Sequence, residues 1–198
     1  MKNAAKRTAA RIALTLFLLP LGACGAVVIE TGTVAVDKAT VWRNIDDARA
    51  DDPAAQYSVG DALCCSGDVP DGTIYSTVEA MQWLCAAAGH GNADAMLKLG
   101  KIFEGDQVDG LRLVRRAVTA MSTTPTNRAA AHYWYDRADE AHLDGAADDA
   151  TALYQELTAT EKTLAALYAS ASTPPCGWAD LSDPALVKGT SGLAPEQP

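Results

Sequence analysis

The sequence predicts an all-α protein that folds as a short α-solenoid of antiparallel helix pairs. Aromatic residues make up only 6% of the 198-residue chain, and alanine is abundant while β-branched runs are scarce after residue 40, which favours helices over a sheet. Trp42, Trp83 and Trp134 each follow an alanine by three residues, and such an internal repeat indicates a stack of similar units. The length accommodates one ordinary domain with targeting and tail segments.

The first 23 residues are typical of an export signal. Four basic side chains precede an apolar run over residues 12–21 that is too short for a comfortable membrane span. The run ends in "LGAC", which resembles the lipobox of bacterial lipoproteins and implies cleavage before Cys24 and acylation of its thiol. By the same resemblance, Gly25 in place of an aspartate implies an outer-membrane lipoprotein that faces the periplasm. The alternative is an ordinary signal peptide cut nearby.

The charge balance limits the class of partner. Removal of the four basic residues within 1–23 leaves 12 basic against 25 acidic side chains, a formal net charge of −13. Such a surface repels nucleic acid and anionic headgroups, so the lipid must hold the protein at its membrane, and a basic protein or peptide partner is favoured. Residues 24–37 lack helical periodicity and are expected to form a lipidated, extended tether.

Residues 38–170 are expected to form the helical repeat domain. Around Trp83, apolar residues recur at spacings of three and four, which gives one apolar stripe along a helix. Ser76 to Glu79 has the spacing of a capping box at the head of this helix. Pro125 is expected to open the helix that carries Trp134.

Glycines mark the turns and the close contacts of the repeat. Gly91 is expected to turn the chain between two helices, and Gly60 and Gly100 are expected to let a neighbouring helix approach closely.

The stretch "EAMQWLCAAAGHGNADAMLKLGKIFEG" resembles the Sel-one-like repeat family, a relative of the tetratricopeptide repeat. The resemblance covers about residues 38–160, with weaker matches around Trp42 and Trp134. It implies stacked helix pairs and a role as a scaffold of envelope complexes, of secretion or polysaccharide machinery, or of signalling. The matching residues are Ala80, Trp83, Ala87, Ala88, Gly91, Ala95, Leu99, Gly100 and Phe103.

Three segments depart from a simple repeat. An insertion around residues 106–126 can form a short additional helix, which either packs on the solenoid or contacts a partner. Residues 148–169 are expected to form one long amphipathic helix that caps the stack. Residues 171–198 are rich in Pro, Gly and Ser, and are expected to form an irregular tail pinned by Cys176, with Trp178 covering exposed core.

Four cysteines besides Cys24 indicate two disulfides in an exported protein. Because a bond between adjacent residues would strain the backbone, the favoured pairing joins one of Cys64 and Cys65 to Cys85 and the other to Cys176. The disulfide interpretation also outweighs a nucleophilic Cys85.

No motif of a known catalytic site is present, so the protein is not expected to be an enzyme or to carry a cofactor. His90 is expected to be a turn residue at the surface. His132 and His142 lie ten residues apart, too far for joint ligation along one helix, and Asp139, three residues before His142, could share its face. A metal-binding or enzymatic protein built on His132, Asp139 and His142 is therefore the weaker alternative.

The leading hypothesis is a lipid-anchored periplasmic adaptor that holds a protein or peptide on a concave helix face, without a small-molecule substrate. Two alternatives are a periplasmic regulator that restrains a membrane sensor and a structural stabiliser of the envelope with no discrete ligand. The side chains expected to contact the partner are Tyr57, Asp61, Lys98, Lys101, Tyr133 and Arg137.

Overall fold

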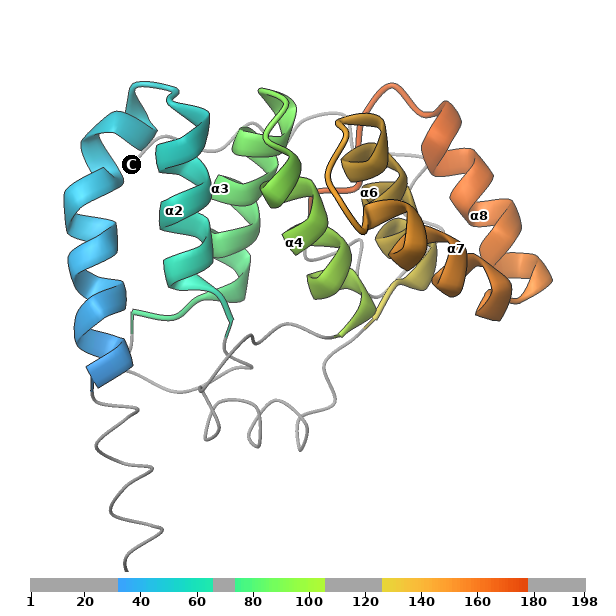
Figure 1. Cartoon of the computed structure of the whole chain (residues 1–198), viewed down its shortest axis with the longest axis horizontal. Helices are drawn as coiled ribbons and strands as arrows, with labels where there is room; N and C mark the ends of the chain where they lie inside the picture. Colours follow the sequence, from blue (N-terminus) through green and yellow to red (C-terminus); the bar gives the residue numbers. More distant parts are fainter. Residues whose placement is uncertain (1–31, 66–73, 106–125, 178–198) are drawn as a thin grey trace, which may run out of the picture.

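Every regular element in the described part of the chain is a helix, which confirms the all-α prediction for these residues (Figure 1). The computed structural model describes residues 32–65, 74–105 and 126–177. Within these ranges, no helix is long and apolar enough to cross a bilayer. A helix over residues 32–49 is followed by α2 (Pro53–Leu63), α3 (Thr77–Gly89), α4 (Ala93–Glu104), α6 (Arg128–Glu140), α7 (Ala146–Glu156) and α8 (Ala159–Ser170).

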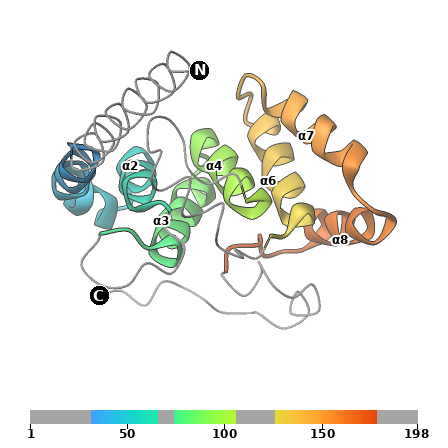
Figure 2. The ribbon, with the colours of Figure 1, turned by 90° about the horizontal axis from the view of Figure 1, so that it is seen from below.

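The helices form a row in which each packs mainly on its neighbours in the sequence. α2 contacts α3, α3 contacts α4, α4 contacts α6, and α6 contacts both α7 and α8. Figure 1 and Figure 2 place helix 32–49 at one end of the row and α7 and α8 at the other. Most of the buried apolar side chains along this row belong to one cluster.

Most of the helices begin at a polar side chain that accepts a hydrogen bond from the first turn. Asp52, Ser76, Asn92 and Asn127 do so for α2, α3, α4 and α6, at the third helical residue in each case. This satisfies a backbone donor that has no partner within the helix. The predicted start at Ser76 is confirmed, whereas α6 begins behind Asn127 and not at Pro125, which lies outside the described residues.

Two glycines bring neighbouring helices into close contact, as the sequence predicts. A Cβ atom added at Gly60 would lie 2.8 Å from Leu84 Cγ in α3, and one added at Gly100 would overlap the ring of Tyr135 in α6. Gly91, with φ of +86°, turns the chain between α3 and α4, which confirms that prediction as well. The spacing of α2–α3 and of α4–α6 therefore depends on the missing side chains.

The three tryptophans are not equivalent in the structure. Trp134 is 3% exposed and Trp83 is half-buried, but Trp42 is 87% exposed, so the repeated tryptophan of the sequence does not take the same place in each unit. Within helix 32–49 the buried residues Asp37 and Ala48 lie eleven residues apart, about three turns, and so mark one inward side. Trp42 is five residues from Asp37 and six from Ala48, which places it on the opposite side of the helix.

The expected long helix over residues 148–169 is two helices. α7 ends before Leu157, and α8 begins behind Thr158. The Thr158 side chain accepts from the Glu161 backbone, and the Glu161 carboxylate accepts from the Thr158 backbone N–H at 2.7 Å, a complete capping box. The apolar periodicity hid this start signal, because apolar residues continue at helical spacings from α7 into α8 across the break.

Replacement of Thr158 by alanine is expected to destabilise the protein by about 1 kcal/mol, since it removes the N-cap hydroxyl of α8. Urea unfolding followed by circular dichroism measures this change. Thr163→Ala, in the same helix, is the control, because the exposed Thr163 hydroxyl bonds only within the helix, to the Ala159 carbonyl. Equal stability of Thr158→Ala and wild type would contradict the cap.

The cost of Thr158→Ala is also expected to depend on pH. Hydrogen bonds from the Thr158 backbone and then its side chain lower the pKa of Glu161 from the usual 4.5. A group whose pKa falls on folding contributes stability above its unfolded pKa, and that contribution is lost as the pH falls through the folded value. The difference between the variant and wild type should therefore be full at neutral pH and shrink once the pH drops below about 4.5.

The favoured cysteine pairing is wrong, because Cys64 pairs with Cys65, and Cys85 pairs with Cys176. The end of α2 lies against the start of α3, where the Ser76 backbone N–H donates to the Leu63 carbonyl at 3.1 Å. Cys85 is nine residues beyond Ser76, about 14 Å along the helix, and so lies far from Cys64. Cys176 reaches Cys85 because the chain after α8 runs back over the helices.

The described part of the tail is held at two points. Trp134 Nε1 donates to the Pro175 carbonyl at 2.8 Å, and the disulfide between Cys85 and Cys176 follows one residue later. The predicted pin at Cys176 is thus confirmed, while Trp178 lies outside the described residues.

At the other end, residues 32–37 are helical, so the expected extended tether is wrong for that part of 24–37. The export signal, Cys24 and residues 106–125 of the expected insertion lie outside the described residues.

Candidate functional site

The polar face of α6 supplies one wall of a cleft. Alanines and two aromatic side chains of this helix are buried against α4 and α8. The helical period leaves His132, Asp136 and Asp139 together on another face, at spacings of four and three residues.

α7 supplies the opposite wall. It begins after Gly145, which has φ of +85° and so allows the chain to reverse its course between the two helices. Ala147, Thr151, Tyr154 and Gln155 again follow the helical period and are exposed. The buried Ala150 lies at the bottom of the cleft, and its small side chain leaves the space open.

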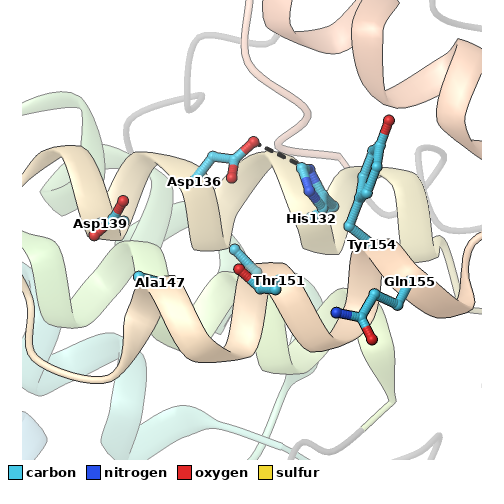
Figure 3. Close-up of a pocket in the computed structure, with 8 residues that line it drawn as sticks. His132, Asp136, Asp139, Ala147, Thr151, Tyr154 and Gln155 are labelled. Atoms are coloured by element: carbon cyan, nitrogen blue, oxygen red, sulfur yellow. Dashed lines mark ion pairs between the residues drawn. The ribbon is translucent and has the colours of Figure 1, made fainter.

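The two walls enclose an open cleft of about 490 Å³ (Figure 3). His132 Nδ1 lies 3.1 Å from Asp136 Oδ2, and the His132 ring contacts the Tyr154 ring with centroids 5.0 Å apart. Lys162 of α8 places its ammonium group 4.7 Å from the centre of the Tyr154 ring. The aromatic end of the cleft is therefore held by three elements, and the carboxylates of Asp136 and Asp139 give the cleft its acidic character.

An ion pair fixes the two walls relative to each other. Arg128, at the start of α6, reaches Glu156, at the end of α7, with its Nη2 atom 2.8 Å from Oε2. Asn127 Nδ2 also donates to the Tyr168 hydroxyl at 2.8 Å and so ties α6 to α8. The cleft thus lies on a packed scaffold of three helices.

The structure does not assemble the alternative metal site. Among the described residues, no group of three His, Cys, Asp or Glu side chains could hold a metal ion. His132 pairs with Asp136 instead of sharing a ligand set with Asp139. His142 is exposed in the turn after α6, and its backbone N–H donates to the Asp139 carbonyl at 2.7 Å.

Two of the predicted partner-contacting residues bind each other. Lys98 of α4 is only 4% exposed, and its Nζ atom lies 3.0 Å from Asp61 Oδ1 of α2. Display of Lys98 to a partner is therefore a wrong prediction, because α4 packs on α2, α3 and α6 at once and little of its surface is left. Tyr57 and Lys101 are half-buried on α2 and α4.

Tyr133 and Arg137 belong to α6, which forms one wall of the cleft, but their side chains do not line the cleft and interact with other residues of α6. Tyr133 packs edge-on against Trp134 at 5.1 Å, and burial raises the pKa of its phenol, against the opposing effect of Arg137. Arg137 is exposed and pairs with Glu140 one turn later. The structure thus does not bring the six predicted residues together in one surface.

The cleft residues that the sequence reasoning missed are Asp136, Thr151, Tyr154 and Gln155. Tyr154 is 45% exposed, although an aromatic side chain is typical of a core position. A usable signal was present, since polar residues at 132, 136 and 139 form a stripe on an alanine-rich helix. The partner stripe on α7 could be matched to it only once the two helices were packed together.

His90 and Cys85 behave as structural residues. His90 is exposed and caps the end of α3, with its Nδ1 atom 3.2 Å from Gln56 Oε1. This confirms the prediction of a turn histidine, and the disulfide removes Cys85 as a free nucleophile.

No protein-family model, curated protein or solved structure matches the chain. The resemblance to Sel-one-like repeats therefore depends on the residues of this chain alone.

Proposed function

We propose that the protein is a lipid-anchored adaptor of the bacterial envelope, in which a short solenoid of Sel-one-like helix pairs holds a basic segment of a partner protein. Acylation of Cys24 would place it at the outer membrane, facing the periplasm. The observation that carries the proposal is the open acidic cleft between α6 and α7.

The cleft has the chemistry of a receptor for a lysine or arginine side chain. The carboxylates of Asp136 and Asp139 can accept hydrogen bonds from an ammonium or guanidinium group. Gln155 and Thr151 offer further acceptors from the opposite wall, and the apolar surface of Ala147 can cover the aliphatic stem of the bound side chain. The overall acidity of the chain adds long-range attraction for a basic partner, which predicts association that weakens with salt.

A photo-crosslinking amino acid at position 151 is expected to give one dominant crosslinked protein in the native cell envelope. Thr151 is exposed inside the cleft, and the same probe at Ala169, exposed on α8, is the matched control. Mass spectrometry identifies the product and shows whether the crosslinked segment is basic. Equal products from both positions, or none from position 151, would contradict the proposal.

The double variant Asp136→Asn and Asp139→Asn tests the charge. It is expected to reduce the crosslink at position 151 by roughly threefold or more, since each exposed ion pair contributes up to about 1 kcal/mol. An unchanged yield would show that the cleft carboxylates do not bind the partner. If the partner is the periplasmic part of a membrane sensor, the regulator alternative is favoured over a passive scaffold.

A further inference from the structure

Helix 32–49 has an apolar outer face that the rest of the described chain does not cover. Its opposite side packs inward, where Ala48 is buried and Asp37 accepts a hydrogen bond from the Tyr75 hydroxyl at 2.8 Å. On the outer side, Trp42 is 87% and Val36 is 61% exposed, the two largest values among the exposed large apolar residues of the described chain. With Ala35 and Ala39, also exposed, these residues form the outer face.

The outer face lies within residues 35–42 and does not extend to the last turns of the helix. Its members lie at spacings of three and four residues, so they share one side of the helix. The following turns carry charge instead, including Asp46, Asp47 and Arg49. An apolar surface that faces only water does not stabilise a helix, so the separation of the apolar outer face from the charged turns indicates that another surface covers the outer face.

The length of chain before the helix limits how far this face can lie from an anchored Cys24. Gly32 is eight positions after Cys24, and a fully extended chain of that length spans at most about 28 Å. Trp42 lies ten residues further, about 15 Å along the helix axis. The face is therefore always within reach of the bilayer that holds the acyl chains.

The side chains around the outer face suit the headgroup region of a bilayer. Tryptophan is enriched at membrane interfaces because its ring is apolar while its N–H remains a donor. Lys38 and Arg43 are exposed beside the outer face, and their long stems can cover apolar surface while their charges reach phosphate groups. Asp37, next to Val36 in the sequence, is buried toward Tyr75 and does not face outward. The exposed Asp46, four residues after Trp42, marks the charged end of the outer face.

We propose that the outer face of helix 32–49 lies on the lipid bilayer, with Trp42 in the headgroup region. The inference rests on the proposed lipid anchor at Cys24. It gives the protein a fixed orientation, because α7 and α8 lie at the opposite end of the row of helices (Figures 1 and 2). The acidic cleft is then held away from the membrane that carries the anchor, where a periplasmic partner can reach it.

Quenching of tryptophan fluorescence by brominated lipid tests this orientation. The full lipidated protein is reconstituted into phosphatidylethanolamine and phosphatidylglycerol vesicles with or without brominated acyl chains, and vesicle flotation measures anchoring separately. All samples carry Trp178→Phe, which leaves Trp42, Trp83 and Trp134 as emitters. Bromination is expected to quench part of the emission of this parent protein, and Trp42→Phe is expected to remove most of that quenching while Trp83→Phe does not.

Each outcome decides between named possibilities. Protein that floats with the vesicles but shows no quenching, or equal quenching in Trp42→Phe, would overturn this inference and leave the anchor intact. Emission that shifts with protein concentration instead of with bromination would assign the face to a second copy of the chain. Protein that does not float would overturn the anchor, and with it both the localisation in the proposed function and this inference. Because Trp42 is exposed, Trp42→Phe leaves the core intact.

Discussion

Loss of the disulfide between Cys85 and Cys176 is expected to lower the free energy of unfolding by about 4 kcal/mol, since the bond closes a loop of 91 residues and cross-links of long loops restrict the unfolded chain most. The change is the double variant Cys85→Ala and Cys176→Ala, measured by urea unfolding against wild type. This bond is also one of the two points that hold the described part of the tail on the helices, the other being the hydrogen bond from Trp134 Nε1 to the Pro175 carbonyl.

Reduction provides the control for this effect. Dithiothreitol should destabilise the wild type by a similar amount but the double variant only slightly, because the bond between Cys64 and Cys65 closes no loop. A non-reducing digest should yield one linked pair of peptides containing Cys85 and Cys176, with Cys64 and Cys65 retained in a peptide of their own. A product that links three peptides would show that the pairing first expected from the sequence is correct after all.

Gly100→Ala is expected to destabilise the protein by about 1–2 kcal/mol, although alanine is a better helix former than glycine by about 1 kcal/mol. The added methyl group would overlap the ring of Tyr135. That ring cannot easily move, because Tyr135 is 3% exposed and its hydroxyl donates to Glu104 Oε2 at 2.7 Å. Thermal or urea unfolding of the variant measures the balance between the two effects.

Gly89→Ala is the matched control for Gly100→Ala. It lies in the last turn of α3 with nothing within 4 Å of an added Cβ atom, so it should be neutral or stabilising. Combination with Tyr135→Ala should remove most of the cost of Gly100→Ala, which a double-mutant cycle would show. Gly100→Ala that is as stable as wild type would contradict the close contact between α4 and α6.

Local signals in the sequence predicted much of the helical framework. The start of α3 at Ser76 and the turn at Gly91 depend on a few neighbouring residues, and both are confirmed. The close approach at Gly60 and Gly100 was also predictable, since a glycine inside a helical pattern needs a packing reason. The break between α7 and α8 was predictable in principle from Thr158 and Glu161, but the continuous apolar stripe outweighed the capping signal.

The candidate site was much less predictable. His132 was singled out, but its partners are Asp136 and Tyr154, one of which is on a different helix. Lys98 was expected to be displayed, although it is buried against Asp61. Both errors have the same cause. The contacts and the exposure of a helical side chain depend on which other helices pack on its own helix, and the pattern of residues within one helix does not contain that information.

The amino-acid sequence by itself determined the helical class, the capping residues and the glycines at close contacts, because each depends on residues within one or two turns of each other. The tertiary structure decided which side chains face water and which cysteines meet. Helix 32–49 packs inward with the side that carries Asp37 and Ala48, which leaves Trp42 exposed, and the return of the tail over α3 joined Cys85 to Cys176. These outcomes depend on the packing angle between helices and on contacts between residues far apart in the chain, which periodicity within one helix does not specify.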